Sequence, residues 1–119
     1  MKWLIVAAGV MWLSVGLAND QKRGVIWGSG GNSCGAYVLS GQRPAERARY
    51  MQWVAGYLSA VNVRTPHVYS IVPGNNLDGV AIWLDNYCKA HPVDILLNGI
   101  EHLLKDQQQK NGIEDPSGQ

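Results

Sequence analysis

The sequence predicts an all-α fold: a small single domain of three main helices, preceded by a short N-terminal helical turn and joined by one disulfide. The first observation is size and composition, since 119 residues, 46% hydrophobic and 16% charged, suit one globular domain. The second is that apolar residues recur at helical spacing in three stretches. The third is a single pair of cysteines, Cys34 and Cys88. A formal net charge of +1 argues against a nucleic-acid partner.

Residues 1–18 have the pattern of a secretory signal peptide. Lys2 supplies a positive charge, an apolar run spans residues 3–17, and Gly16 and Ala18 are the small residues of a cleavage site. The run is shorter than the roughly 20 apolar residues of a membrane-spanning helix, so cleavage is favoured over a retained anchor. We therefore expect a periplasmic protein with no membrane segment and no net formal charge, because cleavage removes Lys2.

Export favours a disulfide between the two cysteines, because disulfides persist in an oxidising compartment. Cys34 and Cys88 allow one intramolecular pairing, which closes a loop of about 55 residues and contributes roughly 4 kcal/mol in the chain-entropy model. The alternative, Cys34 as a nucleophile, needs a base held beside it, and no pattern in the sequence identifies one. A structural disulfide is the expectation.

A flexible, glycine-rich arm is expected over residues 19–32, before the helical domain. Its Gly28-x-Gly30 pair does not continue as a nucleotide-binding loop, because Ser33 stands where the third glycine belongs. Residues 33–39 then predict a short helical turn that carries Cys34, and Ser40-Gly41 ends it.

A long helix is predicted from Pro44 to about residue 62, because proline suits a first helical turn. Trp53 widens its buried face, and Gly56 in mid-helix, which costs about 1 kcal/mol against Ala, predicts a close helix crossing. The apolar stripe of this helix consists of Tyr50, Val54, Tyr57, Leu58 and Val61.

Residues 63–76 predict a long loop, rich in turn-forming residues and unusually apolar through Val68, Tyr69, Ile71 and Val72. Loops of this length are often functional. Two roles stay open for it: a cover folded back onto the core, or a partner-binding edge.

Two more helices follow this loop. The first is capped by Asn76, and Pro92 both ends it and starts the next, which is expected to reach about Gln109. Ion pairs four residues apart are expected on their solvated sides, from Asp85 to Lys89 and from Glu101 to Lys105. The helical domain thus spans residues 33–109, and residues 110–119 predict a disordered tail. The two apolar faces consist of Leu77, Val80, Ala81, Leu84 and Cys88, and of Val93, Leu96, Leu97, Ile100 and Leu104.

No motif predicts catalysis, a metal or a cofactor, so we expect a protein that is not an enzyme. His102 and Asp106 share a helix face, but a third ligand is not specified and an ordinary solvated ion pair explains them. The three histidines and nine carboxylates would nevertheless gain protons in acid, with loss of ion pairs from the folded state.

Three segments, Ser33–Gly35, Trp53–Ser59 and Asn86–Pro92, resemble the HdeA/HdeB-like periplasmic proteins over about residues 33–104. The resemblance implies a small all-α domain with one disulfide between the positions of Cys34 and Cys88. It also implies an acid-stress chaperone: a homodimer at neutral pH that dissociates in acid, exposes apolar helix faces and holds unfolding client proteins.

Two alternatives remain open. The chain is also similar to the Tai-like immunity proteins of type VI secretion, in its Gly-Tyr helix and its aliphatic helix after a proline, which implies binding of one toxin partner through a preformed surface. A structural envelope protein whose 63–76 loop packs on a larger assembly is the third reading; for it, Tyr69→Ala and Ile71→Ala would abolish assembly without unfolding. The predicted client or partner contacts are Trp53, Tyr57, Tyr69, Ile71 and Trp83.

Overall fold

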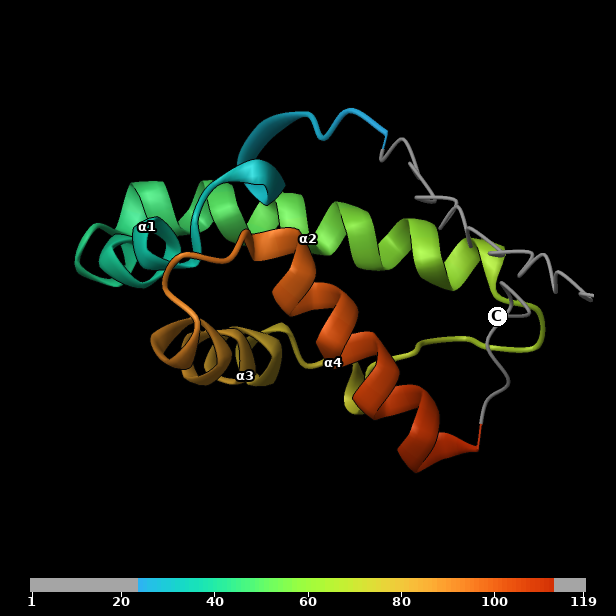
Figure 1. Cartoon of the computed structure of the whole chain (residues 1–119). Helices are drawn as coiled ribbons and strands as arrows, with labels where there is room; N and C mark the ends of the chain where they lie inside the picture. Colours follow the sequence, from blue (N-terminus) through green and yellow to red (C-terminus); the bar gives the residue numbers. More distant parts are fainter. Residues whose placement is uncertain (1–23, 113–119) are drawn as a thin grey trace, which may run out of the picture.

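The computed structural model describes residues 24–112; the predicted signal peptide, residues 19–23 of the predicted arm and residues 113–119 of the predicted tail lie outside this range. In Figure 1, α2 runs across the upper part of the molecule beneath the blue N-terminal segment, and α3 and α4 lie next to each other below α2. The predicted all-α domain, with three main helices, a short preceding helix and one disulfide, is confirmed. The helices in chain order are η1 (Gly28–Gly31), α1 (Cys34–Leu39), η2 (Ser40–Gln42), α2 (Pro44–Arg64), η3 (Pro73–Asn75), α3 (Leu77–Ala90) and α4 (Leu96–Asn111).

The core is one cluster to which every main helix contributes. The helices α2, α3 and α4 bury most of their predicted apolar stripes, apart from the exposed Leu77 and Val93. The short helix α1 adds Tyr37, whose ring meets that of Tyr50 edge-on at 5.5 Å. Among the largest fully buried side chains are Tyr37, Ile71, Leu84, Leu96, Ile100 and Val54.

Gly56 in α2 is not at a helix crossing. It is exposed, and a β-carbon built on it would meet nothing within 4 Å. The close approach is instead at Gly99 of α4, where a β-carbon would lie 3.0 Å from Cδ1 of Tyr87 and 3.3 Å from Cδ2 of Leu84. The prediction of a crossing at Gly56 is therefore wrong, and α3 and α4 form the tight helix pair.

The helix α3 begins where the sequence predicts. The side chain of Asn76 accepts a 2.9 Å hydrogen bond from the backbone N–H of Gly79, which satisfies a donor that the first turn of a helix leaves free. The predicted cap is confirmed, and α3 ends at Ala90 before Pro92.

The start of α4 is later than predicted. Pro92 does not begin it: Ile95 is extended and pairs with Ser33, and the N–H of Leu96 donates to the carbonyl of Asn32 at 2.9 Å. Because the backbone around residue 95 binds the N-terminal segment, it is not available for a helical turn. Val93 is 94% exposed and does not belong to the buried face as predicted.

Residues 24–33, here called the N-terminal strap, pack on the domain instead of forming the predicted flexible arm. The indole N–H of Trp53 donates to the carbonyl of Trp27 at 2.6 Å. A β-carbon on Gly30 would lie 2.1 Å from Cη2 of Trp53, so only glycine lets the backbone approach the indole this closely. The glycines at positions 28 and 30, which led to the prediction of a flexible arm, thus allow the backbone to pack closely against Trp53.

The segment after α2 covers the core, which is one of the two roles left open for it. Ile71 is fully buried, and its N–H donates to the side-chain oxygen of Asn62 at 2.9 Å. Tyr69, two residues earlier, is 90% exposed.

Candidate functional site

The disulfide joins α1 to α3 and is fully buried. Cys34 and Cys88 are both 0% exposed, with their α-carbons 4.7 Å apart. Both thiols of the sequence are consumed in this bond, so neither is a nucleophile. The predicted structural pairing is confirmed.

Asp94 organises the turn between α3 and α4. Its carboxylate accepts hydrogen bonds from the hydroxyl of Tyr87 at 2.6 Å, from the side-chain amide of Asn98 at 2.6 Å and from the N–H of Ile95 at 2.9 Å. The carbonyl of Asp94 also accepts from the N–H of Cys34 at 2.7 Å. This one residue therefore contacts α3, the start of α4 and α1, and we call the turn built around it the Asp94 junction.

The hydrogen bonds of the junction shift the pKa values of two of its groups. The hydrogen bond from Tyr87, helped by those from Asn98 and Ile95, lowers the pKa of Asp94 below its ordinary 3.8, against the opposing effect of burial. Burial, together with the same hydrogen bond to Asp94, raises the pKa of Tyr87 to about 12. The carboxylate is thus ionised and the phenol protonated at neutral pH, which is the combination that the geometry requires.

Aromatic rings surround Tyr87. Trp83 is stacked with it at 5.7 Å between centroids, His91 at 4.3 Å, and His102 of α4 lies at 5.1 Å. The side chains of Trp83, Tyr87 and His102 line an open groove between α3 and α4, with Lys105 among its polar residues. The junction therefore carries an aromatic surface on one side, held in place through Tyr87.

A second polar contact holds α2 to α3. The guanidinium of Arg47 lies 4.0 Å above the ring of Tyr37 and donates to the carboxylate of Asp85 at 2.9 Å. Both side chains of this ion pair are largely shielded from solvent, with 18% and 30% of their surface exposed. Sequence reasoning missed this pair, because 38 residues separate its members and no pattern connects them.

Of the ion pairs among residues 24–112, none is one of the two predicted from helical spacing. Asp85 pairs with Arg47 instead of Lys89, because α2 packs beside it. On α4, Lys110 contacts Asp106 at 2.8 Å, and the predicted pair between Glu101 and Lys105 is wrong.

The predicted contact residues lie in separate places. Trp53 is stacked with Tyr57 on α2, at 5.6 Å, with the strap against it, and Trp83 lies in the groove between α3 and α4. Tyr69 is exposed on the segment between α2 and α3. The structure thus groups Trp53 with Tyr57 alone.

Ile71 is not a surface contact. Its side chain is fully buried in the core, so it cannot touch a partner while the domain is folded. Truncation of such a residue costs about 2 to 5 kcal/mol, so Ile71→Ala would destabilise the domain instead of removing an assembly contact alone. Tyr69 remains available for such a contact.

Across residues 24–112, no three metal-binding side chains come together. Asp106 binds Lys110, in keeping with a solvated ion pair on that face of α4. Within the same range, none of the helices has the length and apolar character needed to span a membrane. Comparison with protein-family models, curated proteins and solved structures finds no match to this chain.

Proposed function

We propose that this chain is an exported, non-enzymatic protein that binds unfolding client proteins after acid loosens its helical domain. The observation that supports the proposal is the Asp94 junction, where one ionised carboxylate joins α3 to the start of α4 and the backbone carbonyl of the same residue contacts α1. The ion pair between Arg47 and Asp85 makes the packing of α2 on α3 depend on a second carboxylate. Protonation of Asp94 removes attractions between α3 and α4 while leaving the apolar contacts.

The pH at which the junction weakens follows from its pKa shift. A folded-state pKa below the ordinary 3.8 means that Asp94 stabilises the fold above that value, and that the stabilisation is lost as the pH falls through the lower, folded pKa. Loss of the carboxylate contacts weakens the attachment of α4 to α3, and leaves the start of α4 held only by its backbone contacts with the strap and its apolar packing. The inner face of α4, formed by Leu96, Ile100 and Leu103, then becomes accessible.

The aromatic surface beside the junction would add to the area that binds client proteins. Trp83 and Tyr87 are half-buried between α3 and α4 in the folded state. Separation of these helices adds both rings to the exposed apolar area, and large contiguous apolar surfaces bind other proteins. Client contact is therefore expected first on α3 and α4.

The experiment is aggregation of acid-sensitive client enzymes at about pH 2 to 3, where carboxylates are largely protonated, followed by neutralisation, with and without residues 19–119. Size-exclusion chromatography at both pH values accompanies it. Suppressed aggregation together with an acid-induced change in size is the expected result. A compact protein at low pH that protects no client would contradict the proposal.

One observation favours a second candidate, a protein that binds one specific partner at neutral pH. Tyr69 and Val63 are 90% and 87% exposed in the folded domain, without any need for acid. Formation of a stable complex at neutral pH, absent in Tyr69→Ala and unaffected by mild acid, would identify this function instead.

A further inference from the structure

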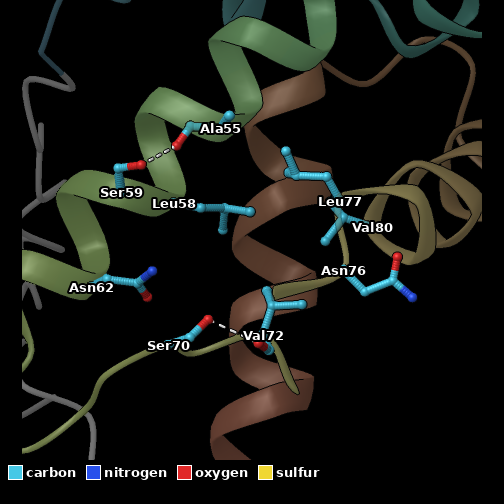
Figure 2. A pocket seen from close by; sticks show the side chains of 9 residues that line it. All are labelled: Ala55, Leu58, Ser59, Asn62, Ser70, Val72, Asn76, Leu77 and Val80. Carbon is cyan, nitrogen blue, oxygen red and sulfur yellow. Dashed lines mark hydrogen bonds between the residues drawn. The ribbon is translucent and has the colours of Figure 1, made fainter. Parts of the chain in front are cut away.

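A pocket of about 190 Å³ opens between the second half of α2, the segment after it and the start of α3 (Figure 2). Leu58, Val72 and Val80 provide apolar walls, and Leu77 stands at the mouth with 40% of its surface exposed. None of the residues that line this pocket contacts Asp94, and none of them is charged.

The polar groups of the pocket are uncharged and are held in place. The hydroxyl of Ser59 donates to the carbonyl of Ala55 at 2.7 Å, and that of Ser70 to the carbonyl of Val72 at 2.8 Å. Asn62 accepts from the N–H of Ile71, which leaves its amide NH₂ as a donor for a ligand. Hydroxyl and amide groups of this kind match the N–H and C=O groups of a peptide, whereas a charged ligand would find no counter-ion here.

The volume of the pocket limits what enters it. A cavity of about 150 Å³ holds one benzene molecule, whereas sites for drug-sized molecules occupy about 300 to 1,000 Å³. A pocket of about 190 Å³ therefore has room for one aromatic or branched aliphatic side chain and is too small for a typical cofactor.

The surface continues beyond the pocket. A second, shallower depression shares Ser70 and Val72 with it and extends along His67 and Tyr69. An extended chain that places one side chain in the pocket therefore passes over the ring of Tyr69, which is 90% exposed and free to pack against it. A lone small molecule would leave this second depression unused.

We infer that this pocket is the anchor site for a protein partner: an extended, uncharged segment that inserts one phenylalanine- or leucine-like side chain between α2 and α3 at neutral pH. The apolar walls bind the side chain, the Asn62 amide and the serine hydroxyls face its backbone, and Tyr69 covers the next residue. Binding occurs in the folded domain, so this inference goes beyond the acid-dependent function proposed above.

The test uses nitrogen-15 amide spectra of residues 19–119 at neutral pH, titrated with three blocked probes. The probes are N-acetyl-phenylalanine amide, the pentapeptide acetyl-Gly-Gly-Phe-Gly-Gly-amide and N-acetyl-glutamate amide. Shift changes confined to the pocket are expected for both phenylalanine probes and absent for the glutamate probe. The pentapeptide should bind about fivefold more tightly than the single residue, since it also reaches the second depression.

Two matched variants locate the site. Ala55→Leu places a larger side chain in the pocket and should weaken both phenylalanine probes by about tenfold, the effect of losing roughly one buried contact. Ala60→Leu makes the same change at an exposed position of α2 outside the pocket and should bind like the parent chain. Tyr69→Ala should remove the advantage of the pentapeptide while leaving the single residue unaffected.

Three results would overturn the inference. They are equal shifts with the glutamate probe, equal binding by Ala55→Leu and Ala60→Leu, and a pentapeptide that binds no better than the single residue. Shifts at the pocket that grow with protein concentration in the absence of any probe, and vanish in Ala55→Leu, would assign the pocket to a second copy of this chain instead. Each of these outcomes is independent of client protection in acid.

Discussion

The hydroxyl of Tyr87 donates a 2.6 Å hydrogen bond to the carboxylate of Asp94, across the turn between α3 and α4. The bond links two groups whose pKa values move in opposite directions, that of Asp94 downward and that of Tyr87 up to about 12. The hydrogen bond favours the ionised form of Asp94, whereas burial first and the hydrogen bond second favour the protonated phenol of Tyr87.

Replacement Asp94→Asn should lower the free energy of unfolding at neutral pH by about 1 to 2 kcal/mol, because hydrogen bonds to a charged acceptor are lost at a half-buried site. Urea unfolding measures this. Asp78→Asn, in the exposed first turn of α3, is the control and should cost only a few tenths of a kcal/mol.

The same variant should also change the response to acid. In the parent chain the contribution of Asp94 is complete above pH 3.8 and disappears as the pH falls below that value. Asp94→Asn carries no such group, so its stability should fall less steeply there. Parallel stability curves for the two proteins below pH 4 would show that the junction does not respond to acid.

Replacement Gly30→Ala should displace the strap from Trp53. The added β-carbon would lie 2.1 Å from the indole, and overpacking of this kind costs about 1 to 3 kcal/mol. Thermal unfolding should shift downward and the tryptophan emission should change. Gly31→Ala, whose β-carbon would meet its nearest neighbour at 3.7 Å, is the control; equal melting of the two variants would argue against the close contact.

Two glycine replacements should act in opposite directions. Gly56→Ala is expected to stabilise the domain by about 1 kcal/mol, because the site is exposed, helical and unobstructed. Gly99→Ala is expected to destabilise it, because its β-carbon would press on Tyr87 and Leu84. Denaturant midpoints of both variants check the pair, and stabilisation by Gly99→Ala would refute the close packing of α3 on α4.

Loss of the disulfide should be costly. Cys34→Ser is expected to lower stability by about 4 kcal/mol in the chain-entropy model, because the bond joins two residues separated by 54 positions in the sequence. The parent chain under reducing conditions should melt like the variant. Equal melting temperatures for Cys34→Ser and the non-reduced parent would show that the disulfide does not stabilise the domain.

The buried face of each helix could be predicted from the sequence, whereas the contacts between residues of different helices could not. The stripe from Val80 to Cys88 and the cap at Asn76 follow from spacing within one helix. The pairing of Arg47 with Asp85 depends on how α2 packs on α3, and helical spacing has no information about that. Gly56 and Gly99 both interrupt a helix, and only the packed structure distinguishes an exposed glycine from one at a crossing.

The candidate site was predicted only in part. Trp53, Tyr57 and Trp83 were predicted as aromatic contacts and lie partly buried against neighbouring elements. Asp94 was not predicted as a site residue, because its three acceptor contacts come from residues on both sides of a turn whose geometry was expected to be helical. The error at the start of α4 and the missed role of Asp94 therefore have the same origin.

The position of the disulfide in the chain divides the molecule into two unequal parts. The bond between Cys34 and Cys88 closes a covalent ring that contains the whole of α2, whereas α4 lies outside the ring and is tethered at one end by a short link. If acid frees α4, the ring cannot open, and recovery requires that one helix of 16 residues dock again on the ring and on the strap. Closure over so short a tether costs little entropy and is fast, on the order of 100 ns for about ten residues. After neutralisation, the return of α4 to its folded position would thus be a unimolecular step whose rate does not depend on protein concentration.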